Sequence, residues 1–220
     1  MKRSLGWIRD LPDFRDYHPR HDAVLPILSR SKALADVSTS LPPSADLRQW
    51  CSPVEDQLNI GSCTANAAAA LLEYFERRST GSHMDASRLF IYKTTRMLAG
   101  DKGDTGAELR TTMKALALLG APPESACPYD ITKYDQDPTP YLYALAANYK
   151  AQQYYRLDPA GTAPSNVLTA IKRSVAGGLP AMFGSAVYSS MPGLGGHEDG
   201  TGNIPFPTHA DRSEGGHAMV

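Results

Sequence analysis

Cys63 is the residue of this chain best placed to do chemistry. It follows Gly61 and Ser62 and precedes a run of alanine and leucine, which predicts a helix that begins near the cysteine. The N-terminal end of a helix carries partial positive charge and unpaired N–H groups, and both favour the thiolate form of cysteine. Gln57 lies six residues upstream, across a glycine-bearing turn. The spacing therefore predicts an ionised sulfur with a hydrogen-bond donor near it.

The other two cysteines are predicted to be structural. The sequence holds three cysteines, Cys51, Cys63 and Cys127, so at most one disulfide can form and one thiol must remain. Small secreted proteins usually carry an even and dense set of cysteines. We therefore expect one working thiol at Cys63, with Cys51 and Cys127 as small buried apolar residues.

Composition narrows the classes of partner. The chain has 220 residues, a net charge of −1 and a pI near 6.6, so no polycationic face for nucleic acid is expected. No apolar run reaches the roughly 18 residues that a membrane span needs, so no membrane partner is expected. The basic start lacks the apolar stretch of a Sec signal peptide, which predicts a cytoplasmic location by default or export by a non-Sec route.

The helices and strands that must position Cys63 are predicted from the spacing of apolar residues and from the glycines and prolines that end each segment. Apolar residues recur at helical spacing in four segments, and β-branched and aromatic residues mark three strands late in the chain. Helices early and strands late indicate an α+β protein with a helical lobe and a sheet lobe. The Gly/Pro/His-rich segment 189–216 is long enough for a functional or disordered loop. The predicted helices are 63–80, 87–98, 107–119 and 165–176, and the predicted strands are 152–157, 181–188 and 217–220.

Three of these helices have a predicted inner face. Ala68, Leu71, Leu72 and Phe75 share one side of the first helix. Leu109, Thr112, Met113 and Leu116 share one side of the third, and Leu168, Ile171 and Val175 share one side of the fourth. All three sets are expected to be buried.

The first 40 residues differ from the rest. They mix charges with prolines and with Trp7, Phe14 and Tyr17, without helical or strand periodicity. This pattern predicts an extended arm that docks through its large side chains. Residues 29–40 are small and polar, as expected for a linker, and the globular part begins at residue 41.

Several segments together resemble one enzyme family. Residues 53–63 resemble the active-site segment of papain-like cysteine peptidases, and residues 215–220 resemble their histidine segment. Residues 41–48 resemble the start of the mature domain, and residues 104–110 and 127–130 match the helical lobe of bacterial members. The resemblance implies the papain-like two-lobe α+β fold, with an antiparallel β-barrel-like lobe after the helical lobe and the active site in the cleft between them. The implied domains are an arm at 1–40, a helical lobe at 41–130 and a sheet lobe at 131–220.

The resemblance also implies a reaction. Cys63 would attack a peptide bond and form a thioester, and His217 would act as general base and then as general acid. Gln57 would donate a hydrogen bond to the oxyanion together with the Cys63 backbone N–H. Substrates would be proteins or peptides, acted on by a monomer without cofactor or metal. The groups His197-Glu198-Asp199 and His209-Ala210-Asp211 fit no metal-ligand spacing and are expected to be loop residues.

Three small residues are candidates for substrate contact by the same resemblance. Gly106 would offer backbone hydrogen bonds to an extended peptide, and Gly184 and Ala218 would line the main specificity pocket. The alternative is that all three serve packing and turns.

The chain also departs from the family pattern. Thr64 replaces the usual aromatic residue after the nucleophile, and Ile60 stands where many members have a disulfide-forming cysteine, so a helical lobe without a disulfide is expected. The asparagine that orients the histidine in this family lies downstream of it. It would fall beyond Val220, so the sheet lobe is expected to be incomplete in the given sequence.

The arm and the activity each have more than one interpretation. The arm is either a solvated charged segment or a short prosegment that lies in the cleft and blocks it. The chain is either a cysteine endopeptidase inhibited by its arm, an inactive interaction module of the same fold, or a thiol acyltransferase that uses the same cysteine and histidine.

Overall fold

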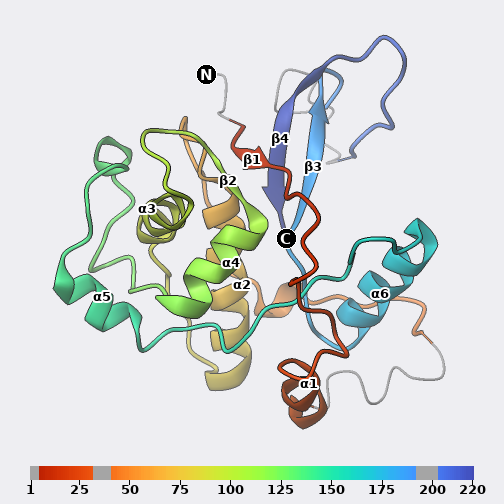
Figure 1. Cartoon of the computed structure of the whole chain (residues 1–220), viewed down its shortest axis with the longest axis horizontal. Helices are drawn as coiled ribbons and strands as arrows, with labels where there is room; N and C mark the ends of the chain where they lie inside the picture. Colours follow the sequence, from red (N-terminus) through yellow and green to blue (C-terminus); the bar gives the residue numbers. More distant parts are fainter. Residues whose placement is uncertain (1–4, 32–40, 192–202) are drawn as a thin grey trace.

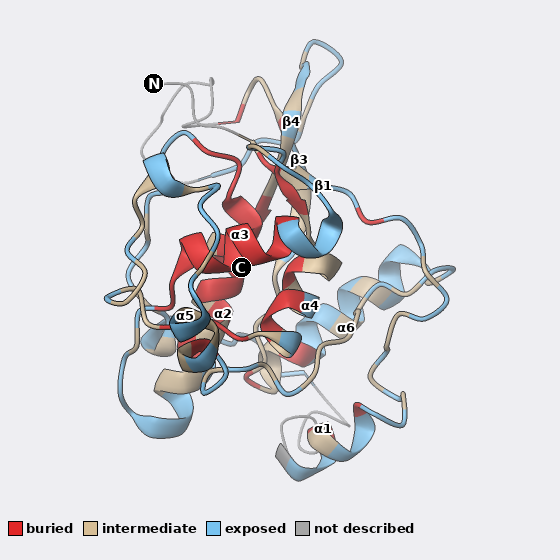
Figure 2. Cartoon of the chain, turned by 60° about the vertical axis from the view of Figure 1, so that its left-hand side comes forward, coloured by how far each residue is buried: buried red, intermediate tan, exposed pale blue. Residues whose placement is uncertain are grey.

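Three helices form the core of the protein. The computed structural model describes residues 5–31, 41–191 and 203–220, and its main hydrophobic core lies among α2 (Cys63–Thr80), α3 (Arg88–Ala99) and α4 (Leu109–Leu118). Figure 2 shows that buried residues concentrate in these helices. Ala68 and Leu71 of the predicted inner face of α2 are buried, but Phe75 is 40% exposed, so the predicted face is too wide by one residue.

Local sequence sets the ends of these helices. Gly81 and Gly100 adopt positive φ angles of 75° and 81° as the C-caps of α2 and α3, as predicted. Ser87 caps α3 by accepting a hydrogen bond from the Phe90 N–H. These caps hold the boundaries within a residue or two of their predicted positions.

The third helix begins later than predicted. Ala107 and Glu108 form a short strand, β2 (Ala107–Glu108), which pairs in parallel with β1 (Trp7–Ile8). The partner strand comes from the arm, a hundred residues away, so helical periodicity alone could not detect the pairing. The arm passes between α2–α4 and the late strands and then reaches α1 (Leu25–Ser31), as Figure 1 shows.

The late strands form one antiparallel pair. β3 (Phe183–Tyr188) pairs with β4 (Ser213–Met219), with Gly184 opposite Ala218 and Ser185 opposite His217. β4 begins four residues before the predicted start, so part of the predicted loop 189–216 is strand, while residues 192–202 of that loop lie outside the described residues. Within the described residues no further strand pairs with β3 or β4, so the barrel stays a prediction.

The strand predicted at 152–157 is wrong. These residues form no ladder, and the Arg156 N–H donates instead to the Tyr17 carbonyl of the arm at 2.8 Å. The prediction rested on the β-propensity of the tyrosines, and local sequence does not reveal that the arm residue Tyr17 lies beside this segment.

The remaining helices contribute no buried residue to the main core cluster, although Ile131 packs against it. The predicted inner face of α6 (Pro164–Ala176) is wrong in two positions, because Leu168 is 53% exposed and Ile171 is 37% exposed, whereas Val175 is half-buried. Periodicity finds an apolar stripe but does not say whether a neighbour covers it. Among the described residues no helix is both long and apolar enough to cross a membrane. The other short helices are η1 (Arg48–Trp50), η2 (Ile131–Lys133) and α5 (Pro140–Ala146).

All three cysteines lie in the described part of the chain and are free. The prediction of a disulfide-free helical lobe is therefore confirmed. Cys127 is half-buried, but Cys51 is exposed, so the expectation that it is a buried apolar residue is wrong. Cys51 follows η1 on a surface turn, where its thiol donates to the Leu47 carbonyl at 3.7 Å.

Candidate active site

The cysteine selected from the sequence is the first residue of α2. Cys63 is 1% exposed, and the turn before it is closed by a hydrogen bond from the Ser62 N–H to the Ile60 carbonyl at 2.9 Å. The backbone N–H groups of Cys63 and Thr64, at the open end of the helix, interact with the sulfur and lower the thiol pKa.

Burial acts on the same sulfur in the opposite direction and is stronger. Loss of water around Cys63 raises the pKa of its thiol, although N–H groups of Ala218 and Gly6 also favour the thiolate. The arrangement therefore favours a protonated thiol, not the ionised sulfur expected from the helix N-terminus. Gly6 belongs to the arm, so the arm is part of what covers the sulfur.

β4 brings the predicted histidine to the same place. Ala218 packs against Cys63 and Ala67, and its backbone N–H lies at the Cys63 sulfur. His217 is the preceding residue of β4 and is half-buried. The pairing of β3 with β4 and the packing of α2 on β4 thus join residues that are far apart in the sequence.

Gln57 lies in the turn that leads to the cysteine. Its side chain is buried, and its Nε2 donates to the Ile60 carbonyl at 3.1 Å. Tyr129 secures this turn at two points, because its hydroxyl donates to the Gln57 carbonyl at 2.9 Å and lies 2.6 Å from the Ser62 hydroxyl. The amide and the sulfur are therefore held by one compact turn.

The three residues predicted to contact substrate all lie against the arm. The Trp7 side chain packs on the cluster of Cys63, Ala67 and Ala218, and Leu109 and Met182 pack on the same cluster. A Cβ atom on Gly184 would lie 2.0 Å from the Trp7 ring. Trp7 thus fills an apolar pocket whose wall includes Gly184 and Ala218.

The arm backbone passes closely between two glycine turns. A Cβ atom on Gly6 would lie 1.9 Å from the Gly61 carbonyl oxygen, and one on Gly106 would lie 2.2 Å from the Gly6 carbonyl oxygen. The Ala107 N–H donates to the Gly6 carbonyl at 2.8 Å. The edge formed by residues 106–108 therefore binds an extended polypeptide, here the chain's own arm.

Comparison with known proteins defines the family. An uncharacterized peptidase C1-like protein of Acanthamoeba polyphaga mimivirus is 30% identical to this chain over 228 residues, which cover 100% of this chain and 72% of the viral protein. The crystal structure of xylellain, a cysteine protease from Xylella fastidiosa, matches 99% of this chain and 78% of its own with 33% identity and a TM-score of 0.72. The chain belongs to the papain-like cysteine peptidases.

Other comparisons add less. No family model matches the chain. Procathepsin L 3 from the larval midgut of Tenebrio molitor is 20% identical, covers 69% of this chain and 46% of its own, and has a TM-score of 0.53, which indicates a shared fold. The predicted papain-like α+β fold is thus confirmed. The relatives come from a bacterium and a virus, so the assignment to the bacterial branch of the family stays a prediction.

Sequence analysis missed several residues of this papain-like site. Gly6 lies against Gly61, Gly216 lies against Trp7, Met182 packs on the cluster of Cys63, Ala67 and Ala218, and Asp104 binds the Gly61 N–H at 2.8 Å. The sequence held a signal for Asp104. An acidic residue two positions before Gly106 can accept a hydrogen bond from the Gly61 backbone, which lies beside Gly106. The other three depend on the path of the arm.

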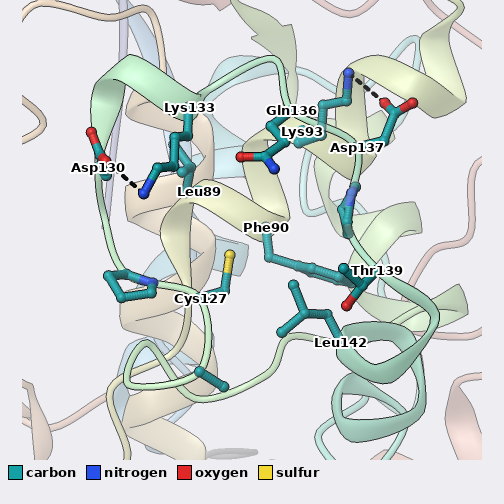
Figure 3. Close-up of a pocket in the computed structure, with 13 residues that line it drawn as sticks. Leu89, Phe90, Lys93, Cys127, Asp130, Lys133, Gln136, Asp137, Thr139 and Leu142 are labelled. Carbon is teal, nitrogen blue, oxygen red and sulfur yellow. Dashed lines mark ion pairs between the residues drawn. The ribbon is translucent and has the colours of Figure 1, made fainter.

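A separate cavity of about 190 Å³ lies between α3 and the 126–142 segment of this peptidase. Figure 3 shows the side chains that line it, and none of the candidate catalytic residues is among them. Its charges are paired, with Lys93 2.9 Å from Asp137 and Lys133 3.0 Å from Asp130. Within the described residues no group of three or more His, Cys, Asp or Glu side chains could hold a metal ion, and residues 197–199 lie outside that part of the chain.

Proposed function

We propose that this chain is a cysteine endopeptidase whose own N-terminal arm inhibits it. The observation that carries the proposal is the path of the arm, which crosses the buried Cys63 sulfur, pairs with residues 107–108 and places Trp7 in a pocket. A groove that accepts an extended chain over a nucleophile is what hydrolysis of a polypeptide requires.

Hydrolysis would proceed through a thioester. His217 takes the Cys63 proton, and the sulfur attacks the carbonyl carbon of the scissile bond, so that negative charge develops on the carbonyl oxygen. The imidazolium then protonates the leaving amine as the C–N bond breaks. A water molecule, deprotonated by His217, attacks the thioester and releases the acid and the free thiol.

Two N–H groups would stabilise the oxyanion. One is the Cys63 backbone N–H at the N-terminus of α2, and the other comes from the Gln57 amide. The Gln57 Nε2 also donates to the Ile60 carbonyl at 3.1 Å, which holds the amide in the turn before Cys63.

The arm has the features of an inhibitor rather than of a substrate. The Gly6 N–H faces the sulfur, while the Gly6 carbonyl is held by the Ala107 N–H. The arm thus presents an N–H donor to the sulfur, while the Gly6 carbonyl, which belongs to the next peptide group, is bound by the 106–108 edge. Burial of the sulfur, to which the arm contributes, raises the pKa of the Cys63 thiol, although the Gly6 N–H itself favours the thiolate.

The proposal is tested on the full chain carrying Gly6→Val, a change that cannot fit beside the Gly61 carbonyl and should displace the arm. We expect hydrolysis of dipeptidyl fluorogenic substrates, modification of Cys63 by an epoxide thiol inhibitor, and loss of both with Cys63→Ser. Cys51→Ser, at the exposed cysteine, is the matched control and should leave both unchanged. Hydrolysis that persists in Cys63→Ser, or labelled Cys63 without any hydrolysis, would contradict the proposal.

A further inference from the structure

One carboxylate connects the two turns that flank the arm. The Gly61 N–H donates to Asp104 Oδ1 at 2.8 Å, and the Tyr92 hydroxyl donates to the same oxygen. The Tyr92 hydroxyl in turn accepts the Gly106 N–H at 3.1 Å. Asp104 itself is exposed, whereas Tyr92 is fully buried in α3. The nucleophile turn, which contains Gly61 and leads to Cys63, and the substrate-binding turn, which contains Gly106, are thus joined through Tyr92 of α3.

The loop that carries Asp104 is held at its other end as well. Arg96, one turn after Tyr92 in α3, is 1% exposed, and its guanidinium lies 4.2 Å from the Tyr92 ring centroid. Arg96 donates to the Gly103 carbonyl and to Asp135 Oδ1. The four residues from Gly103 to Gly106 are therefore fixed at both ends by neighbouring side chains of α3.

The two turns also touch directly. A Cβ atom on Gly61 would lie 3.2 Å from Asp104 Oδ1 and 3.3 Å from the Gly106 Cα. No disulfide ties these segments, because all three cysteines of the chain are free. Within the described residues, the hydrogen bonds of Asp104 and Tyr92 link the turn at Gly61 to the turn at Gly106.

We propose that Asp104 and Tyr92 are positioning residues that set the height of the 106–108 edge above Cys63. The inference rests on the proposed peptidase function. A peptide bound at that edge meets the sulfur only if the edge and the nucleophile turn keep their spacing. A displacement of about 1 Å at such a site can cost roughly a hundredfold in rate.

The two residues should differ in their kinetic effect. Tyr92→Phe breaks the link to Gly106 and leaves the Gly61 bond to Asp104, so we expect KM to rise about 3- to 10-fold with kcat within about twofold. Asp104→Ala removes the acceptor of both the Gly61 N–H and the Tyr92 hydroxyl and should lower kcat/KM by about 30-fold or more. Asp104→Asn keeps an acceptor oxygen for both donors and should stay within about threefold of the parent.

The experiment measures kcat and KM for a dipeptidyl fluorogenic substrate in the full chain with Gly6→Val. Tyr143→Phe, at a tyrosine of α5 whose hydroxyl contacts Met97, is the control for Tyr92→Phe. Asp101→Asn, an exposed carboxylate of the same loop, is the control for Asp104→Asn. A rise in KM equal to that of Tyr143→Phe, or equal losses in Asp104→Asn and Asp104→Ala, would overturn the inference.

A second readout separates this inference from the proposed function. Amide hydrogen exchange of the full chain with Cys63→Ser reports the link without catalysis. We expect faster exchange at Gly106 in Tyr92→Phe and at Gly61 in Asp104→Ala, with α6 unchanged as the internal control. Unchanged exchange at both glycines would refute the link even in an active enzyme. If neither the Gly6→Val chain nor any further variant hydrolyses the substrate, the proposed peptidase function is refuted. The exchange rates of Gly61 and Gly106 then decide whether Asp104 and Tyr92 join the two turns.

Discussion

Opposing influences act on the Cys63 sulfur. Its place at the N-terminus of α2 favours the thiolate, and its burial beneath Gly6 favours the thiol. Burial has the larger effect in this structure and raises the pKa of the thiol. In the proposed mechanism the sulfur is therefore restrained by the group that covers it, and uncovering Cys63 should both open the site and ease ionisation of the thiol.

The role of Gln57 can be tested by a single substitution. Gln57→Ala, in the chain with Gly6→Val, removes one proposed oxyanion donor and should lower kcat by about 10²–10³-fold. Steady-state hydrolysis of a dipeptidyl substrate measures the change. Alkylation of Cys63 by iodoacetamide, which forms no oxyanion, is the control and should change little. A loss of both reactions to the same degree would indicate a collapsed turn instead.

Glu55 makes stability depend on pH. Burial raises the pKa of this carboxyl from 4.5 to about 7, against the attraction of Arg88 at 3.1 Å. Between these values the unfolded chain loses a proton that the folded chain keeps, so stability falls as pH rises from about 4.5 to about 7. Glu55→Gln should flatten that fall. Urea unfolding across this range measures it, with Glu76→Gln as the control for a lost carboxylate, and an unchanged slope would contradict the expectation.

At the scale of elements, a cap residue shows why α3 forms where it does. Ser87 accepts from the Phe90 N–H at 3.2 Å and donates to the Cys127 carbonyl at 2.6 Å, so it both starts α3 and ties it to the 127 segment. Ser87→Ala should destabilise the protein by about 1–2 kcal/mol. Chemical denaturation measures the change. Ser79→Ala, at the exposed end of α2, should cost less than about 0.5 kcal/mol, and equal costs would rule out a special role for the cap.

The helices also show where periodicity reaches its limit. The stripe of α2 meets α3 and α4 and is largely buried, whereas an equally regular stripe on α6 leaves Leu168 and Ile171 exposed. The same pattern therefore has different outcomes, because burial depends on a neighbour that the pattern does not contain.

At the scale of the whole molecule, the arm is fastened at two places. Trp7 fills the apolar pocket, and farther along the arm Asp16 binds Arg110 at 2.6 Å. Arg156 lies 3.6 Å from the same carboxylate, and Asp10 accepts the Arg110 backbone N–H at 2.9 Å. Loss of the first contact should therefore uncover Cys63 while the arm stays attached to the protein.

This leads to a prediction for the full chain. Gly6→Val places a side chain against the Gly61 carbonyl, where even a Cβ atom would lie 1.9 Å from the oxygen. Overpacking of this kind costs about 1–3 kcal/mol, and 1.4 kcal/mol corresponds to about tenfold in an equilibrium. Hydrolysis of a dipeptidyl substrate should rise by about tenfold or more.

Phe14→Ala is the matched control for the arm. Phe14 is 98% exposed, so the expectation that it docks is wrong, and its loss should leave the rate unchanged. Equal rates for the parent chain and Gly6→Val, with Cys63 still reactive in both, would mean that the arm does not inhibit.

The sequence by itself determined the features that depend on neighbours within a few residues. Cys63 at a helix start, Gln57 in the turn before it, and the ends of α2 and α3 all follow from local pattern and capping. Only the tertiary structure decided that Trp7 fills the pocket, that residues 107–108 pair with the arm, and that Asp104 and Tyr92 join two turns. Each of these contacts links segments that are distant in sequence, or depends on which loop a helix side chain meets. The spacing of apolar residues along the chain does not specify such neighbours.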